Sequence, residues 1–197
     1  MKQKQIFIAA LFFTITGFSR AGFSQTQAQM KKLDAGDIII SLKEDSGSEI
    51  PKAHLIAVVD SAPSKVWEIV SNCNKFKQRM PRIANAKIVS VKGKRVTCDV
   101  EIDLPFPLSN LHAKTVALHQ AGPKVWTRKW KLVDGDFDFN NGSWKLSFYK
   151  DDPNRTYVEY RIHASPKTSV PVGVRKMLQK SSLKKMIINI REHAKKL

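Results

Sequence analysis

Residues 96–104 read VTCDVEIDL, a run in which apolar and polar side chains alternate. One face of this run carries Val96, Cys98 and Val100, and the other face is polar. A period of two predicts a β-strand with one buried and one solvent-exposed face. The links to the segments that follow are too short for crossover helices, so we expect consecutive antiparallel strands. Further strands are predicted at about 111–119, 125–133, 143–150 and 156–164.

The segments on either side of this meander complete an α+β pattern. Upstream, two runs rich in Ile and Val at 37–42 and 54–59 predict strands joined by a hairpin loop. Two short helices follow, the first opened by Pro63 and the second stopped by Pro81. We expect one α+β domain, in which a curved antiparallel sheet wraps around a long C-terminal helix. That helix is predicted within 171–197, with an apolar stripe of Leu183, Met186, Ile187, Ile190, Ala194 and Leu197.

The first segment has the layout of an export signal. Lys2 and Lys4 precede an uncharged apolar run at 6–18, which is shorter than the roughly 20 residues of a membrane-spanning helix. Small residues follow, and cleavage is expected after Ala21 or Ala28. These features predict a periplasmic or secreted protein. The expected division is a signal peptide at 1–28, a polar leader with the N-terminal strand and hairpin at 29–51, and the main domain at 52–197.

The composition is that of a globular but strongly basic chain. It has 42% hydrophobic residues, and its 34 Lys or Arg against 17 Asp or Glu give a formal charge of +17. The final 27 residues, 171–197, hold eight Lys or Arg against Glu192. Nucleic-acid binding would use such charge, but export argues against it. A solvated basic face and docking of the C-terminal helix on an anionic membrane surface both stay open. We expect a monomer.

The two cysteines, Cys73 and Cys98, are too few for a disulfide-stapled miniprotein or a four-cysteine zinc site. An exported chain meets an oxidising compartment, where a disulfide between them would persist. Sequence does not give their separation in space. Cys98 lies on an apolar strand face and Cys73 follows a helical pattern, so we favour two buried thiols over a disulfide.

Several short motifs resemble those of START-like ligand-binding domains. Within these, the chain looks most like the coenzyme-Q-binding and polyketide cyclase/dehydrase branch. The resemblance covers about residues 52–197 and implies a helix-grip fold, in which the sheet and the last helix enclose an apolar cavity for a lipid, quinone, sterol or polyketide. The motifs are APSKVWEIV at 62–70, Phe76, Met80-Pro81, a glycine-tryptophan hairpin formed by the turn Asp136-Phe137 followed by Asn141-Gly142-Ser143-Trp144, Pro166 and Pro171.

Large side chains repeat on one face of neighbouring predicted strands, where a cavity would lie. Some of them would pack against the helix, and the others would line a pocket, because small-molecule sites are mostly apolar with a few polar groups. The predicted ligand-binding residues are Trp126, Arg128, Trp130, Trp144, Phe148, Tyr160 and Met177.

Arg128 is the polar exception on that face. A buried guanidinium requires a carboxylate, carbonyl oxygens or a ligand oxygen to offset its desolvation. Two interpretations stay open. In the first, Arg128 has a structural role, in an ion pair or turned outward at a bulge. In the second, it contacts the head group of a ligand at the cavity wall.

Signals for catalysis and metal binding are poor. The five histidines form no HExxH motif, and GxSxG, CxxC and a glycine-rich phosphate loop are absent from the sequence. The acidic stretch DGDFDFNNG at 134–142 lacks the closing carboxylate of a calcium loop. We therefore predict no catalytic residue, metal or cofactor, and an exported, non-enzymatic binding or carrier protein for a hydrophobic small molecule. The alternative is a cyclase or dehydrase acting on a polyketide-like substrate in the same cavity.

Overall fold

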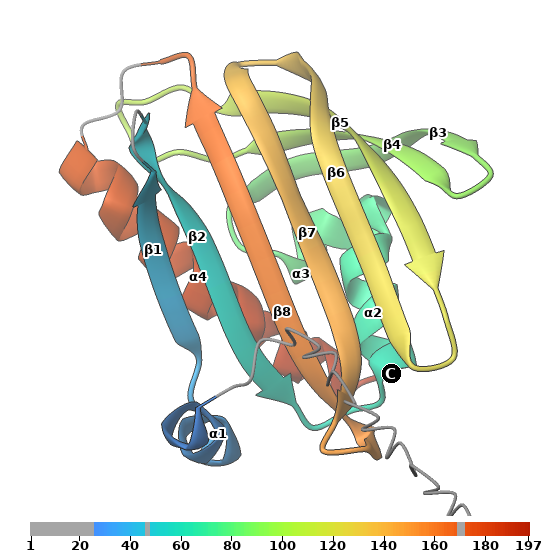
Figure 1. The fold of residues 1–197 in the computed structure, drawn as a ribbon. Helices are drawn as coiled ribbons and strands as arrows, with labels where there is room; N and C mark the ends of the chain where they lie inside the picture. Colours follow the sequence, from blue (N-terminus) through green and yellow to red (C-terminus); the bar gives the residue numbers. More distant parts are fainter. Residues whose placement is uncertain (1–25, 46–47, 169–171) are drawn as a thin grey trace, which may run out of the picture.

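The strands of the structure form a single antiparallel sheet, ordered β1-β2-β8-β7-β6-β5-β4-β3 (Figure 1). The structure is a computed structural model that describes residues 26–45, 48–168 and 172–197, the side chains of 44–49 and 172–179 excepted. The predicted meander is confirmed, although the seventh strand begins at Phe137 rather than 143. The strands are β1 (Ile39–Asp45), β2 (Ser48–Val59), β3 (Ile83–Lys92), β4 (Arg95–Ile102), β5 (Leu111–Ala121), β6 (Val125–Gly135), β7 (Phe137–Tyr149) and β8 (Asp152–Pro166).

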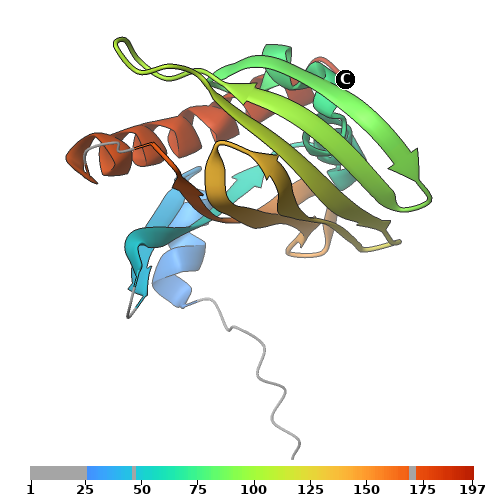
Figure 2. The same cartoon turned by 90° about the horizontal axis from the view of Figure 1, so that it is seen from above.

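Helices α2 and α4 cover the inner face of this sheet, which curls around them (Figure 2). The predicted α+β arrangement around a long C-terminal helix is confirmed. Within the described ranges, no helix is long and apolar enough to cross a membrane. The helical elements are α1 (Gln27–Asp34), α2 (Pro63–Ser71), the 3-10 turn η1 (Cys73–Lys75), α3 (Phe76–Arg79) and α4 (Val172–Ala194).

The main core lies between these helices and the sheet, and helical periodicity decides which side chains enter it. Proline occupies the first turn of α2, where its missing N–H costs no hydrogen bond. Val66, Ile69 and Val70 then share one buried face. The predicted stripe of α4 is buried from Leu183 to Ala194, but Leu197 lies beyond the helix end and is 44% exposed.

The polar segment ahead of β1 contains a helix that the sequence analysis did not predict. Thr26 caps α1, and its side chain and that of Gln29 form a reciprocal capping box. Leu33 is fully buried on the outer face of the sheet, against Ile56 and Tyr149. Helix α1 therefore packs on the domain, and its few apolar residues explain why periodicity did not reveal it.

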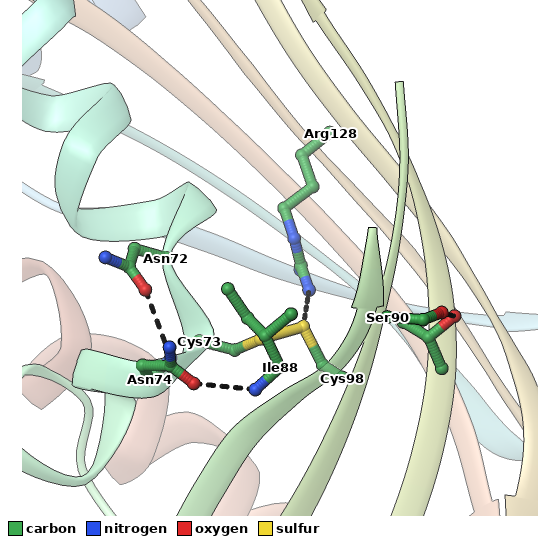
Figure 3. The surroundings of a disulfide bond; sticks show 8 residues. Asn72, Cys73, Asn74, Ile88, Ser90, Cys98 and Arg128 are labelled. Carbon is green, nitrogen blue, oxygen red and sulfur yellow. Dashed lines mark hydrogen bonds between the residues drawn. A yellow bond between two sulfur atoms is a disulfide. The ribbon is translucent and has the colours of Figure 1, made fainter. Parts of the chain in front are cut away.

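Cys73 and Cys98 form a disulfide, so the prediction of two buried thiols is wrong (Figure 3). The Asn74 side-chain oxygen accepts a hydrogen bond of 2.7 Å from the backbone N–H of Ile88, which fixes η1 against β3. This contact places Cys73 over the inner face of β4, with 6.3 Å between the two cysteine Cα atoms. The sequence could not give this proximity, because it depends on how β3 and β4 curl over η1.

The capping box bears on where an exported chain is cleaved. Cleavage after Ala28 would remove Thr26 and the first two residues of α1, whereas cleavage after Ala21 keeps the cap. We expect the mature protein to begin at Gly22. N-terminal sequencing of protein isolated from its native cell envelope would check this, and an intact Met1 would contradict export.

Candidate ligand cavity

A cavity of about 360 Å³ lies between the inner face of the sheet and helices α3 and α4. Most of its wall is apolar and comes from β4 to β8, from residues 80–83, and from the second half of α4. The volume falls within the range of small-molecule sites, roughly 300–1,000 Å³. The polar groups in the described wall include Arg128, Tyr160, Asn140 and Thr115.

Strand register brings three of the predicted site residues into one row. Arg128 of β6 pairs with Trp144 of β7, which in turn pairs with Tyr160 of β8. All three project from the inner face and are less than a tenth exposed. Trp130 lies in the next row and stacks on Tyr160, with 5.8 Å between ring centroids. These side chains line the cavity, while their role in binding stays a prediction.

Gly142 makes room for Trp130 in that second row. A Cβ atom on Gly142 would lie 2.2 Å from the Trp130 ring and 2.5 Å from the carbonyl oxygen of Arg161. The ring is held over β7 because its Nε1–H donates a 3.0 Å hydrogen bond to the side-chain oxygen of Asn140. The turn of the predicted glycine-tryptophan hairpin falls at Asp136, between β6 and β7, and the Asn141–Trp144 segment lies within β7.

Arg128 is buried without a carboxylate partner. It is 4% exposed, and its guanidinium carbon lies 5.1 Å from the ring centroid of Trp130 and 5.5 Å from that of Phe76. Nη2 lies 3.9 Å from Sγ of Cys98, and Nε has no hydrogen-bond partner among the described residues. Burial lowers the pKa of Arg128 to about 10, although Tyr160 partly opposes this shift. The described residues therefore contain no ion pair to Arg128.

The other titratable groups of the wall do not pair with this charge. Burial raises the pKa of the Tyr160 hydroxyl, which is therefore neutral near pH 7. Arg82 also lines the cavity and forms a 3.5 Å ion pair with Asp103. Among the described lining residues, none is Asp, Glu or His.

Three predicted site residues are not placed at the cavity. Trp126 and Phe148 pack edge-on against one another, 6.0 Å apart, and neither lines the cavity wall. The side chain of Met177 lies outside the described residues. Conversely, the wall includes Asn140, Phe137 and Thr115, which the sequence analysis did not select. The inward phase of β5 could have identified Thr115, but its small side chain gave no aromatic signal.

The histidines and acids outside the cavity have structural contacts. His119 lies inward next to Arg128 and packs edge-on against Trp67, with ring centroids 5.3 Å apart. Burial, and then the charge of Arg128, lower the pKa of His119 to about 4. In the predicted acidic loop, the Asp136 carboxylate accepts a 2.7 Å hydrogen bond from the backbone of His112. Across the described part of the chain, His, Cys, Asp and Glu side chains form no metal-binding cluster.

Comparisons with known proteins match this geometry. A family model described as polyketide cyclase/dehydrase and lipid transport matches residues 59–191, while a search of curated proteins finds no significant match. The STAR-related lipid transfer protein of Xanthomonas axonopodis is 18% identical, with a TM-score of 0.71 over 80% of this chain and 93% of that protein. Human StAR-related lipid transfer protein 5 is 12% identical, with a TM-score of 0.68 over 82% and 83%.

An enzyme with the same architecture also matches. The Zhui aromatase/cyclase from Streptomyces sp. R1128 is 11% identical, with a TM-score of 0.55 over 73% of this chain and 90% of the enzyme. Identities this low show the fold alone. Together with the family match, they confirm the START-like helix-grip fold that the motifs predicted.

Replacing Gly142 with Ala should disturb the cavity wall. The added methyl group must displace the Trp130 ring or the β8 backbone, and overpacking of this kind costs about 1–3 kcal/mol. Urea unfolding should show this loss, and near-ultraviolet circular dichroism should report the moved indole. Ser143→Ala, at the next position along β7, is the control and should change stability by less than about 0.5 kcal/mol. Equal stability of the two variants would contradict the packing.

The lowered pKa of His119 predicts a loss of stability in mild acid. Between pH 6.5 and about 4, the unfolded chain binds a proton that the native ring excludes, so the free energy of unfolding falls as pH falls. The ring is only half-buried, which limits the effect to about 1 kcal/mol. NMR titration should place the His119 midpoint near 4, and His119→Phe should lose less stability than wild type between pH 7 and 5. A midpoint near 6.5 would contradict the prediction.

Proposed function

Because the chain belongs to the polyketide cyclase/dehydrase and lipid transport family, we propose that it is a binding or carrier protein for a hydrophobic small molecule with an anionic head. The observation that carries this proposal is Arg128, a buried cation at the cavity wall with no carboxylate partner among the described residues. A guanidinium recognises carboxylate or phosphate oxygens through its planar set of N–H donors. An anionic head would therefore supply the partner that the described residues do not.

The rest of the wall suits the apolar body of such a ligand. Burial of apolar surface contributes about 25 cal/mol per Å², so selection by shape and apolar area provides most of the affinity. The cavity volume of about 360 Å³ is near the lower end of small-molecule sites. This size favours a single-chain lipid or a compact ring system over a large two-chain lipid.

The titratable groups of the wall support a carrier over an enzyme. General acid–base catalysis works best with groups whose pKa values lie near the operating pH. Arg128, with a pKa of about 10, and Tyr160, whose pKa is raised by burial, both keep their protons at pH 7. The cyclase alternative rests on these same two groups, because a phenol and a guanidinium in the wall of one cavity would stabilise a developing enolate oxygen.

Two further parts of the proposal concern location. The N-terminal segment and the Cys73–Cys98 disulfide both support a periplasmic or secreted protein, since disulfides persist in oxidising compartments. Lys180, Lys184 and Lys185 are exposed on α4 and would attract anionic lipid head groups when the carrier exchanges its ligand. Such docking would weaken as salt rises, because screening shortens the reach of exposed charges.

Arg128→Met tests the role of the cation. Titration with the fluorescent fatty acid cis-parinaric acid should show at least about tenfold weaker binding to the variant, and the uncharged methyl ester should bind both proteins alike. Removing an unpaired buried charge should leave the free energy of unfolding unchanged or raise it by up to about 3 kcal/mol. Arg161→Met is the matched control, because its side chain is 53% exposed and pairs with Glu159.

The outcomes separate the alternatives. Unchanged affinity for cis-parinaric acid in Arg128→Met would reject the head-group contact. Mass spectrometry of the small molecule that copurifies from the native host would separate carrier from cyclase. A carrier returns its ligand unaltered after incubation, whereas an enzyme would convert it to a cyclised or dehydrated product.

A further inference from the structure

The cation of the cavity and the disulfide are in direct contact. Figure 3 shows the Arg128 side chain directed at Sγ of Cys98, with 3.9 Å between Nη2 and the sulfur. Both cysteines are fully buried. In a disulfide this sulfur is a neutral, weak acceptor, so it leaves the charge of Arg128 uncompensated. The oxidised pair therefore keeps the cation available to a ligand.

Reduction of the disulfide would change that balance. A dithiol reductant supplies two electrons, its own two thiols become a disulfide, and the bond between Cys73 and Cys98 breaks. Cys73 takes one of the two protons released by the reductant. Cys98 either takes the second proton or leaves it to solvent and remains a thiolate. A guanidinium within about 4 Å favours the thiolate, although burial opposes it.

The described residues around Cys98 offer the thiolate no other charged partner. Arg128 from β6 is the only described cation in contact with the sulfur. His119 from β5 lies next to Arg128, and Tyr160 from β8 lies in the same row beyond Trp144; both are neutral near pH 7. The side packed from η1 and α3 is apolar, formed by Cys73 and Phe76.

Acidic side chains do not compete for this position among the described residues. Asp99, the next residue on β4, projects to the outer face, where it pairs with His112. Glu101 follows it on the same face and accepts a 2.8 Å hydrogen bond from Asn110. Among the described residues, a thiolate at Cys98 would thus be the one anionic group that faces Arg128.

We propose that the Cys73–Cys98 disulfide sets the charge selectivity of the cavity. When the disulfide is closed, Arg128 is an unpaired cation that accepts an anionic head. When it is open, the Cys98 thiolate pairs with Arg128 and competes with that head. The ligand part of this inference rests on the proposed function, whereas the thiolate–guanidinium pair does not depend on it.

Two variants isolate the sulfur of Cys98. Cys73→Ser leaves a single thiol beside Arg128, and the double variant Cys73→Ser/Cys98→Ser leaves none. Both lack the disulfide, so both lose the same chain constraint and differ only at residue 98. Ultraviolet absorbance of the thiolate, followed against pH, should give the Cys98 thiol in Cys73→Ser a pKa at least about one unit below that in Cys73→Ser/Arg128→Met.

Ligand titrations form the second arm, with cis-parinaric acid as the anionic probe and its methyl ester as the neutral one. At pH 8, Cys73→Ser should bind the acid at least about tenfold more weakly than either wild type or Cys73→Ser/Cys98→Ser. Its affinity should recover below the thiol pKa, where the sulfur is neutral. The methyl ester should bind the three proteins equally. If Cys73→Ser does not fold, dithiol-reduced wild type and reduced Arg128→Met replace it: both carry two thiols, and the lower of the two thiol pKa values should rise when Arg128 is removed.

Each failure has a different signature. Equal thiol pKa values with and without Arg128 would overturn the ion pair, whatever the ligand. If the thiol pKa is lowered but Cys73→Ser and Cys73→Ser/Cys98→Ser bind the acid equally, the proposed control of charge selectivity is overturned. Loss of acid affinity in Arg128→Met would still support the proposed function. If oxidised wild type does not bind the acid, the proposed function and the selectivity both fail, and the thiol titration alone decides the ion pair.

Discussion

The burial of one positive charge is the constraint around which the inner face of this protein is organised. Arg128 occupies an apolar wall, where a guanidinium is costly unless neighbouring groups offset its desolvation. The faces of Trp130 and Phe76 provide part of that compensation through their ring electrons, and the sulfur of Cys98 provides a weak contact. Gly142 contributes indirectly, because its missing side chain leaves room for the Trp130 ring to lie beside the cation.

Local periodicity accounts for the parts of the fold that were predictable. A period of two fixes which side chains of β4 to β8 face inward, and a helical period fixes the buried stripe of α4, because each depends only on neighbours in the chain. The disulfide and α1 depend on packing between distant segments. Cys73 meets Cys98 because η1 is held against β3, and α1 is held by Leu33 and its contacts with the outer sheet face.

In the candidate site, too, periodicity predicted which face of the sheet a side chain occupies but not where the cavity lies. The alternation of apolar and polar residues predicted an inner-face position for Trp126, Trp130, Trp144 and Phe148. All four side chains do lie on the inner face of the sheet. The same alternation does not predict at which point along the strands the helices leave room for a cavity. Trp126 packs with the main core and with Phe148, whereas the row at Arg128 opens into the cavity. The position of the cavity follows from the placement of α3 and α4, which no strand pattern contains.

The START-like fold accommodates both lipid carriers and a polyketide cyclase among its structural relatives, so architecture alone does not separate the two activities. Our preference for a carrier rests instead on the chemistry of this chain's cavity wall. A cation that titrates only near pH 10 holds an anion throughout the physiological range but exchanges no proton there. The neutral phenol of Tyr160 in the same wall can donate a hydrogen bond and likewise keeps its proton. Such a wall is suited to holding a charged head in an apolar pocket, and this asymmetry between binding and proton transfer is the physical basis for preferring a carrier.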